Sequence, residues 1–203
     1  MDLTTQPLYL FIKDLVTFLL TTTGIVIAGI GLSTWRKNIK GTKEFETAYN
    51  LHYSVLRLRD AIKHVRNPAI WNAENYKAIQ HFKNKYPDKA NNKDLEKNSN
   101  VFVYEMRWEE ITNAYTEMES YLLAAEVLWG PEILEKIKNL KKKVAELNVA
   151  LVQYLNPDQR TRRHDELFKI VYDVGNEDEK DAFSQEVSKA IEVIANYIKQ
   201  KIK

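Results

Sequence analysis

The histidines and acidic residues of this chain are the first place to look for chemistry. Asp60 and His64 are one helical turn apart, which is the spacing of a hydrogen-bonded acid–base pair. Such pairs are also common on solvated helix faces, so the spacing alone does not indicate catalysis. None of the 4 histidines has a glutamate three residues before it, the spacing that builds metal sites in helical bundles. The sequence therefore predicts no enzyme activity, no metal and no cofactor.

A basic cluster is the second candidate site. Arg160, Arg162 and Arg163 stand together near the start of an expected helix. A guanidinium group binds a phosphate or carboxylate with two hydrogen bonds, so this cluster could bind an acidic partner. The alternative is a solvated helix face. No glycine-rich phosphate-binding loop accompanies the cluster, because the 6 glycines lie in an apolar stretch, at Gly41 or at expected helix ends.

Composition limits the remaining function classes. The chain has 203 residues and no cysteine, which excludes thiol catalysis, disulfides and thiolate metal sites. Its formal net charge is only +2, so no overall field attracts nucleic acid, and we expect no nucleic-acid partner.

One apolar stretch determines the expected organisation. Residues 15–35 contain no charged side chain, and a helix of about 20 apolar residues crosses a bilayer. The preceding residues 1–14 are not basic and the apolar run is too long for a signal peptide, so we predict a membrane anchor. A buried core helix is the alternative, but apolar residues cover every side of this helix. Residues 1–14 either extend the span or lie at the membrane interface.

The flanking charges predict the orientation of this anchor. Lys13 stands alone on the N-terminal side, whereas Arg36, Lys37 and Lys40 follow Trp35 closely. Basic residues stay preferentially on the cytoplasmic side, and tryptophan favours the interface. We therefore expect a single-pass protein of the cell membrane with residues 36–203 in the cytoplasm.

Small residues recur within the apolar stretch at alternating steps of four and three. This seam consists of Thr17, Thr21, Gly24, Ala28 and Gly31. Small residues let a second membrane helix approach closely, so the seam is a candidate packing surface. The alternative is that glycine and threonine are simply common in membrane helices.

Residues 36–203 read as an all-α domain. Apolar residues recur every 3.5 residues on average, which predicts core-facing helices with heptad packing. The first stripe is Phe45, Ala48, Leu51, Val55, Leu58, Ile62 and Val65. It ends at Asn67–Pro68, because proline disfavours helical geometry in the residue before it. Residues 69–100 are predicted as a partly flexible loop containing a short helix, with Tyr76, Ile79 and Phe82 facing inward.

Two long stripes follow and predict an antiparallel hairpin of helices. Nine heptad positions, Trp108 among them, run from Val101 to Trp129, and a second stripe runs from Ile133 to Tyr154. Gly130 and Pro131 between them are the residues expected to end one helix and begin the next. At this spacing Trp108 is expected in the core.

A further short helix is expected up to about Asp173. Asn176 is then expected to cap a last helix. The inner face of that helix is Phe183, Val187, Ile191, Ile194 and Ile198. The predicted fold is thus a transmembrane helix followed by an antiparallel helical bundle with coiled-coil-like packing.

The segment from Trp35 to Pro68 resembles a known kind of sequence. Trp35-Arg36-Lys37, Lys40-Gly41, Leu58-Arg59-Asp60-Ala61-Ile62 and Val65-Arg66-Asn67-Pro68 carry the likeness. The segment is similar to the one following the membrane helix in uncharacterised bacterial single-pass membrane proteins with a cytoplasmic helical domain. The resemblance implies the topology and no activity.

Two functions remain open from the sequence. The first is a membrane-anchored interaction protein, acting as a scaffold, adaptor or sensor for a cytoplasmic partner. The alternative is an oligomeric membrane effector that forms a pore or disrupts the membrane. The expected partners are the lipid bilayer and either another protein or further copies of this chain.

Overall fold

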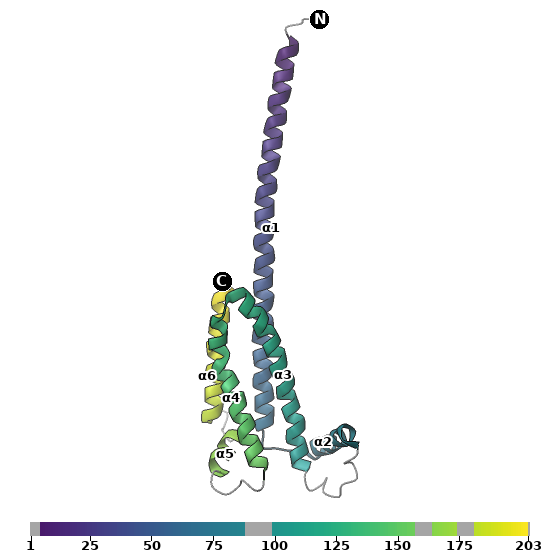
Figure 1. Ribbon diagram of the computed structural model, residues 1–203, viewed down its shortest axis with the longest axis vertical. Coiled ribbons are helices and arrows are strands. Elements are labelled where there is room, and N and C mark those ends of the chain that lie inside the picture. Colours follow the sequence, from purple (N-terminus) through teal and green to yellow (C-terminus); the bar gives the residue numbers. More distant parts are fainter. Residues whose placement is uncertain (1–4, 88–98, 157–163, 174–180, 203) are drawn as a thin grey trace. The chain divides into compact units, whose positions relative to one another are not determined.

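The computed structural model describes residues 5–87, 99–156, 164–173 and 181–202. In these ranges the chain forms helices and no strand, which confirms the predicted all-helical class. The helices are α1 (Thr5–Arg66), α2 (Asn72–Lys85), α3 (Ser99–Trp129), α4 (Glu132–Leu155), α5 (His164–Val171) and α6 (Ala182–Lys201), shown in Figure 1.

The chain divides into two compact units, Met1–Phe45 and Glu46–Lys203. Helix α1 contributes its earlier residues to the first unit and its later residues to the second. Among the described helices, α1 alone is long and apolar enough to cross a membrane. The most apolar stretch of 18 residues in α1 has a mean hydropathy of 2.1, and none of its residues is buried.

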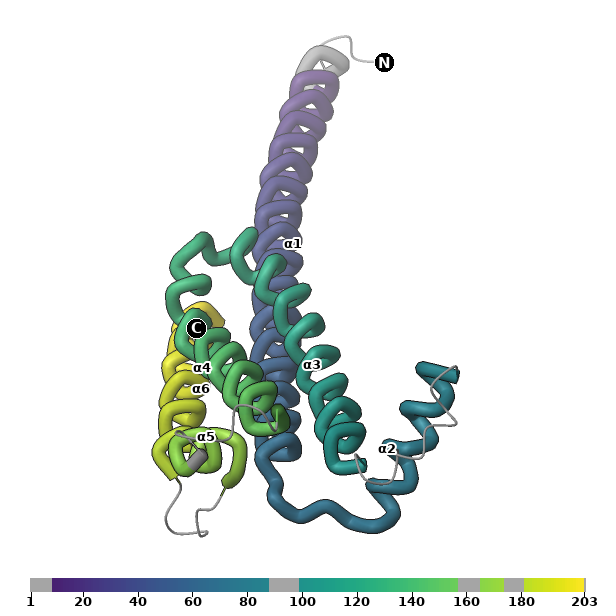
Figure 2. Tube along the Cα trace, turned by 60° about the horizontal axis from the view of Figure 1, so that its bottom comes forward, coloured from purple at the N-terminus to yellow at the C-terminus, as the bar shows by residue number. Residues whose placement is uncertain are grey.

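The second unit has one hydrophobic core. Helix α4 contacts α3, α5 and α6, while α2 packs on α3 (Figure 2). The predicted stripe of α1 is buried from Ala48 to Val65, because each of its members faces this core. Phe45 was expected on the same stripe but is 60% exposed, since the burial begins only at Ala48. The five predicted inner residues of α6 are all buried, as the spacing indicated.

The helix ends follow the predicted turn residues in two places. Helix α1 ends at Arg66, immediately before Asn67–Pro68. Helix α3 ends at Trp129, and Gly130 has a φ of +84°, a left-handed conformation that glycine adopts without steric cost. The Gly130 N–H donates to the Glu126 carbonyl at 2.8 Å, which closes the last turn of α3.

The last helix starts later than the sequence suggested. Helix α6 begins at Ala182, and its cap is Asp181, whose side chain accepts the Ser184 N–H at 2.9 Å. The predicted cap Asn176 lies outside the described residues.

The inward face predicted for the short helix α2 also needs correction. Tyr76 is 66% exposed, because α2 approaches α3 through the small buried residue Ala78. Phe82 does pack inward, and its ring stacks on Phe102 with the centroids 4.0 Å apart.

Candidate membrane segment and interaction surfaces

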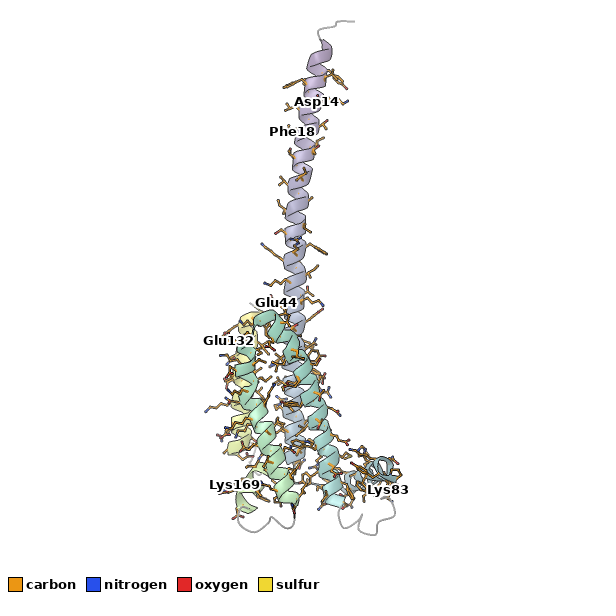
Figure 3. All side chains as sticks on the ribbon, in the orientation of Figure 1. Asp14, Phe18, Glu44, Lys83, Glu132 and Lys169 are labelled. Carbon is orange, nitrogen blue, oxygen red and sulfur yellow. The ribbon has the colours of Figure 1, made fainter. Side chains whose placement is uncertain are left out.

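The apolar residues of the first unit are exposed on every side of α1. Phe18 is 65% exposed, Ile25 66% and Ile30 63%. Figure 3 shows side chains, Phe18 among them, projecting from this stretch without a covering element. Each large apolar side chain left in water costs roughly 1.5–3 kcal/mol relative to burial. This unit therefore contains an apolar surface that no described residue covers.

The seam residues lie along this stretch of α1 with their hydroxyl groups turned to the helix backbone. Thr17 Oγ1 donates to the Lys13 carbonyl at 2.9 Å, and Thr21 Oγ1 donates to the Thr17 carbonyl at 2.7 Å. Such bonds satisfy the hydroxyl within its own helix. At Gly24 and Gly31 an added Cβ would meet nothing within 4 Å, and Ala28 is exposed. The seam is therefore open to a neighbouring helix.

The basic residues after the apolar stretch are also accessible. Trp35 is 59% exposed, and Arg36, Lys37 and Lys40 are exposed beside it. Lys40 Nζ lies 3.8 Å from Glu44 Oε1 in a loose surface ion pair. Exposed pairs of this kind contribute little to stability. The second predicted cluster, Arg160, Arg162 and Arg163, lies outside the described residues.

A buried arginine, Arg66, joins three helices at one end of the second unit. Its guanidinium donates to the carbonyls of Ile170 at 2.7 Å and Tyr172 at 2.8 Å, and to Ser184 Oγ at 2.6 Å. It also pairs with Asp181. Only 1% of Arg66 is exposed. One side chain thus satisfies the last carbonyls of α5 and contacts the cap of α6.

A second buried arginine, Arg107 on α3, holds the connection between α1 and α2. It donates to the Asn67 carbonyl at 2.6 Å and the Ala69 carbonyl at 2.8 Å. Two more bonds, at 2.7 and 2.8 Å, run to the carboxylate of Glu74 on α2. These bonds hold the pKa of Glu74 below its ordinary value, since they stabilise the ionised form.

Sequence reasoning missed both arginines as buried residues. Their positions carried a signal: Arg107 is three residues after Tyr104 and four before Ile111, so it lies on the buried stripe of α3. Arg66 likewise follows Ile62 by one helical turn. A charged residue on an apolar stripe needs a buried partner, and here backbone carbonyls and carboxylates supply it.

The Asp60–His64 pair suggested by spacing is not the one that forms. Asp60 Oδ1 accepts a hydrogen bond from Arg59 at 2.8 Å. His64 Nδ1 lies 2.8 Å from Glu110 Oε2 on α3, and Nε2 lies 3.6 Å from Glu74. His64 therefore links α1 to its neighbours. In the described part of the chain, no three acidic or histidine side chains group together as a metal site would require.

A groove lies between α3 and α4. It consists of two hollows of about 530 and 200 Å³ that share Trp108 and Asn148. Trp108 was expected in the core, but it is only partly buried, because one side of its ring borders these hollows. Lys85 and Glu109 form an ion pair at one end, and Lys141 pairs with Glu119 at the other.

Comparison with known proteins identifies no relative of this chain. No family model, curated protein or solved structure matches the chain.

Proposed function

We propose that this chain is a membrane-anchored helical interaction protein. Residues 15–35 cross the cell membrane once, and residues 36–203 form a cytoplasmic antiparallel bundle with coiled-coil-like packing. That domain acts as a scaffold, adaptor or sensor for a protein partner. The observation that carries the proposal is the unburied apolar stretch of α1 followed by exposed basic residues. A bilayer removes such a surface from water, and no described residue of the chain does so.

Cross-helix pairs support the antiparallel part of this proposal. From Arg57 to His64 along α1, the partners on α3 change from Glu117 to Glu110. Helices α4 and α6 show the same reversal, because Lys136 lies over Tyr197 whereas Lys143 pairs with Glu186. In each pair of helices, moving forward on one means moving back on the other.

An interaction role fits the use of the buried charges better than catalysis does. Arg66 and Arg107 donate hydrogen bonds to backbone carbonyls and form ion pairs with Asp181 and Glu74, respectively. Both side chains therefore hold helix ends together. Buried charged groups with complete hydrogen bonding specify an arrangement of helices. We therefore assign no enzyme activity to the domain.

The second candidate is an oligomeric membrane effector that forms a pore or disrupts the membrane. The open surface at Gly24, Ala28 and Gly31 favours self-association in lipid. The bonding of Thr17 and Thr21 to their own helix weighs against a pore, because those hydroxyls are already satisfied.

Fractionation and protease protection test the first proposal. The full chain with a C-terminal epitope should stay in the membrane pellet after carbonate washing, and protease outside intact cells should leave the epitope undigested. Changing Arg36, Lys37, Lys40 and Lys43 to Gln should expose part of the population, because these charges set the orientation. Recovery of the unmodified chain in the supernatant would contradict the anchor. The mass of the detergent-solubilised protein, with whatever co-purifies, then separates scaffold from effector.

A further inference from the structure

The groove between α3 and α4 contains a cavity of a size that suits a small molecule. Its larger hollow has a volume of about 530 Å³, and ligand pockets in proteins usually measure about 300–1,000 Å³. Helices α3 and α4 supply its long walls, and α2 ends beside it at Lys85. The aliphatic part of its lining consists of Val101, Leu151, Val152 and Leu155. A ligand of this hollow therefore needs an apolar body.

Three aromatic side chains, Tyr86, Tyr104 and Trp108, also line the larger hollow. Two of these rings already lie close to a cation of the protein. Lys85 Nζ is 5.8 Å from the centre of the Tyr86 ring, and the guanidinium carbon of Arg107 is 5.7 Å from the centre of the Tyr104 ring. Among the described residues no cation lies over Trp108, although an indole attracts cations more strongly than a phenol does. The partly exposed ring of Trp108 is therefore an open position for a cation.

The charged side chains of the larger hollow leave one negative charge unmatched. Its lining includes two carboxylates and one ammonium group, those of Glu105, Glu109 and Lys85, which gives a net charge of −1. Glu109 pairs with Lys85 and lies 3.1 Å from His81 Nε2. The hydrogen bond from Lys85 lowers the pKa of Glu109, so this carboxyl group stays ionised at neutral pH. Glu105 is exposed and forms no ion pair with another described residue, so it can pair with a cation from outside.

The smaller hollow, of about 200 Å³, extends the apolar part of the site. Along α3 the larger hollow is lined by residues from 101 to 109 and the smaller one by residues from 108 to 116. Lys141 is the charged residue in the lining of the smaller hollow, and it pairs with Glu119. Because an ammonium group repels a cation, the positive group of a ligand should lie in the larger hollow and its apolar body should point toward the smaller one. The apolar lining there includes Ile111, Tyr115 and Val144.

We propose that this groove binds a lipophilic organic cation, a small molecule with one positive charge on an apolar or aromatic body. The positive group lies over the Trp108 ring and beside Glu105, and the body covers the apolar lining. An anion of the same size would meet the unmatched carboxylate, and a neutral molecule would leave it without a partner. The lining residues all belong to the second unit, Glu46–Lys203, so the site exists with or without the membrane anchor.

Tetraphenylphosphonium and tetraphenylborate test the proposal, because the two ions have nearly the same size and shape and opposite charges. Equilibrium dialysis of the full chain, with the same neutral detergent in both compartments, measures the binding of each ion. The chain should bind about one phosphonium ion saturably and should bind the borate roughly tenfold more weakly, because the lining carries a net negative charge. Substitutions in the hollow then separate this binding from partition into detergent.

Charge substitutions should shift the binding of phosphonium in opposite directions. Glu105→Gln removes the unmatched carboxylate and should weaken binding roughly fivefold, whereas Lys85→Gln frees Glu109 and should strengthen it roughly fivefold. Glu135→Gln is the matched control, because that side chain is 71% exposed and should leave binding unchanged. Glu135 precedes Val152 by 17 residues on α4, a distance of about 25 Å, which exceeds the screening length of about 8 Å in physiological salt. The three substituted side chains are exposed, so the variants retain the core.

An aromatic substitution measures the contribution of the indole ring. Trp108→Leu keeps an apolar side chain beside the groove but removes the indole face, so it should weaken phosphonium binding roughly tenfold. Trp71→Leu is the control, because Trp71 is 71% exposed and does not line either hollow. Circular dichroism of each variant checks that the helices are retained.

Equal binding of the two ions, or stronger binding of the borate, overturns the proposal. Phosphonium binding that neither Glu105→Gln nor Trp108→Leu changes also overturns it, because the ion is then held by detergent or by the apolar stretch of α1. If Trp108→Leu loses helix, the two charge variants decide. Opposite shifts in Glu105→Gln and Lys85→Gln then support the site, and binding equal to that of Glu135→Gln in both variants overturns it.

Discussion

Arg66 and Asp181 are 115 residues apart in sequence, yet Arg66 Nη2 lies 3.1 Å from Asp181 Oδ2. The same guanidinium donates to the Ile170 and Tyr172 carbonyls at the end of α5. Asp181 in turn accepts the Ser184 N–H as the cap of α6. One buried ion pair thus holds together the end of α1, the end of α5 and the start of α6.

Removing this arginine should destabilise the domain strongly. Arg66→Ala removes the cation that pairs with Asp181 and the donor to three carbonyls, those of Lys169, Ile170 and Tyr172. Breaking a buried pair costs about 3–5 kcal/mol. Arg59→Ala is the matched control, because its pair with Asp60 is exposed and should be worth less than about 1 kcal/mol. Urea unfolding of the detergent-solubilised protein, followed by circular dichroism, measures both. Equal losses of unfolding free energy in the two variants would show that the buried pair stabilises the domain no more than the exposed pair does.

Stability should fall in acid because of two carboxyl groups. Hydrogen bonds from Arg107 lower the pKa of Glu74 from 4.5, the ordinary value. Burial raises the pKa of Asp181, but hydrogen bonds to Asp173, the Ser184 N–H and Arg66 outweigh it and lower the pKa from 3.8. Both groups bind protons more weakly when folded, so their contribution is complete above the ordinary values and is lost as pH falls through the lowered ones.

Thermal unfolding between pH 7 and pH 3 checks this dependence. The midpoint should drop as the pH falls below about 4.5. Glu74→Gln should flatten the drop, because it removes one of the two groups. Glu135→Gln should leave the drop in the midpoint unchanged, since that side chain is 71% exposed. A midpoint that stays constant down to pH 3 would argue against both assignments.

Truncation of Trp108 should cost less than its place on the heptad stripe suggests. A fully buried tryptophan changed to alanine loses about 3–5 kcal/mol, but Trp108 is only partly withdrawn from water, so we expect about 2 kcal/mol. The exposed Leu123→Ala should lose about 0.5 kcal/mol or less. Urea unfolding ranks the two variants. A loss above about 4 kcal/mol would show that the groove beside Trp108 is closed in solution.

Two glycines should respond to alanine in opposite directions. Gly130→Ala forces an L side chain to φ +84° and should cost about 1–2 kcal/mol. Gly41→Ala lies inside α1, where an added Cβ meets nothing, so it should stabilise the helix by about 0.5–1 kcal/mol. The helical signal during thermal unfolding reports both. A stabilising Gly130→Ala would mean that the α3–α4 turn has another conformation.

Bulk on the seam should weaken self-association in lipid. Gly24→Leu and Ala28→Leu fill open space beside the helix and should hold a neighbour away, while membrane insertion stays unchanged. Ile27→Leu, off the seam, is the control. Crosslinking in membranes compares the variants with the natural chain. Loss of the crosslinked oligomer in the two seam variants alone favours the effector function. If the natural chain and all three variants are monomeric, the effector function is excluded.

Periodicity predicted the inner faces well because burial of a helix follows its repeat. Val187 and Ile194 of α6 are buried as expected, and Gly130 ends α3 as its backbone freedom predicts. The spacing of apolar residues did not predict buried arginines whose partners are remote in sequence. Arg107 bonds to Glu74, 33 residues away, and Arg66 bonds to Ser184, 118 residues away. Local spacing does not reveal such partners.

The distance from Arg66 to its partners also sets an order of events during synthesis. Ser184 leaves the ribosome 118 residues after Arg66, a delay of roughly 6–24 s at about 5–20 residues per second. During that interval the apolar stripe from Ala48 to Val65 is made but its last covering helix, α6, is not. The nascent chain thus carries the long helix α1 with an unfinished core, which is the stage at which a chaperone or a neighbouring nascent chain can bind it.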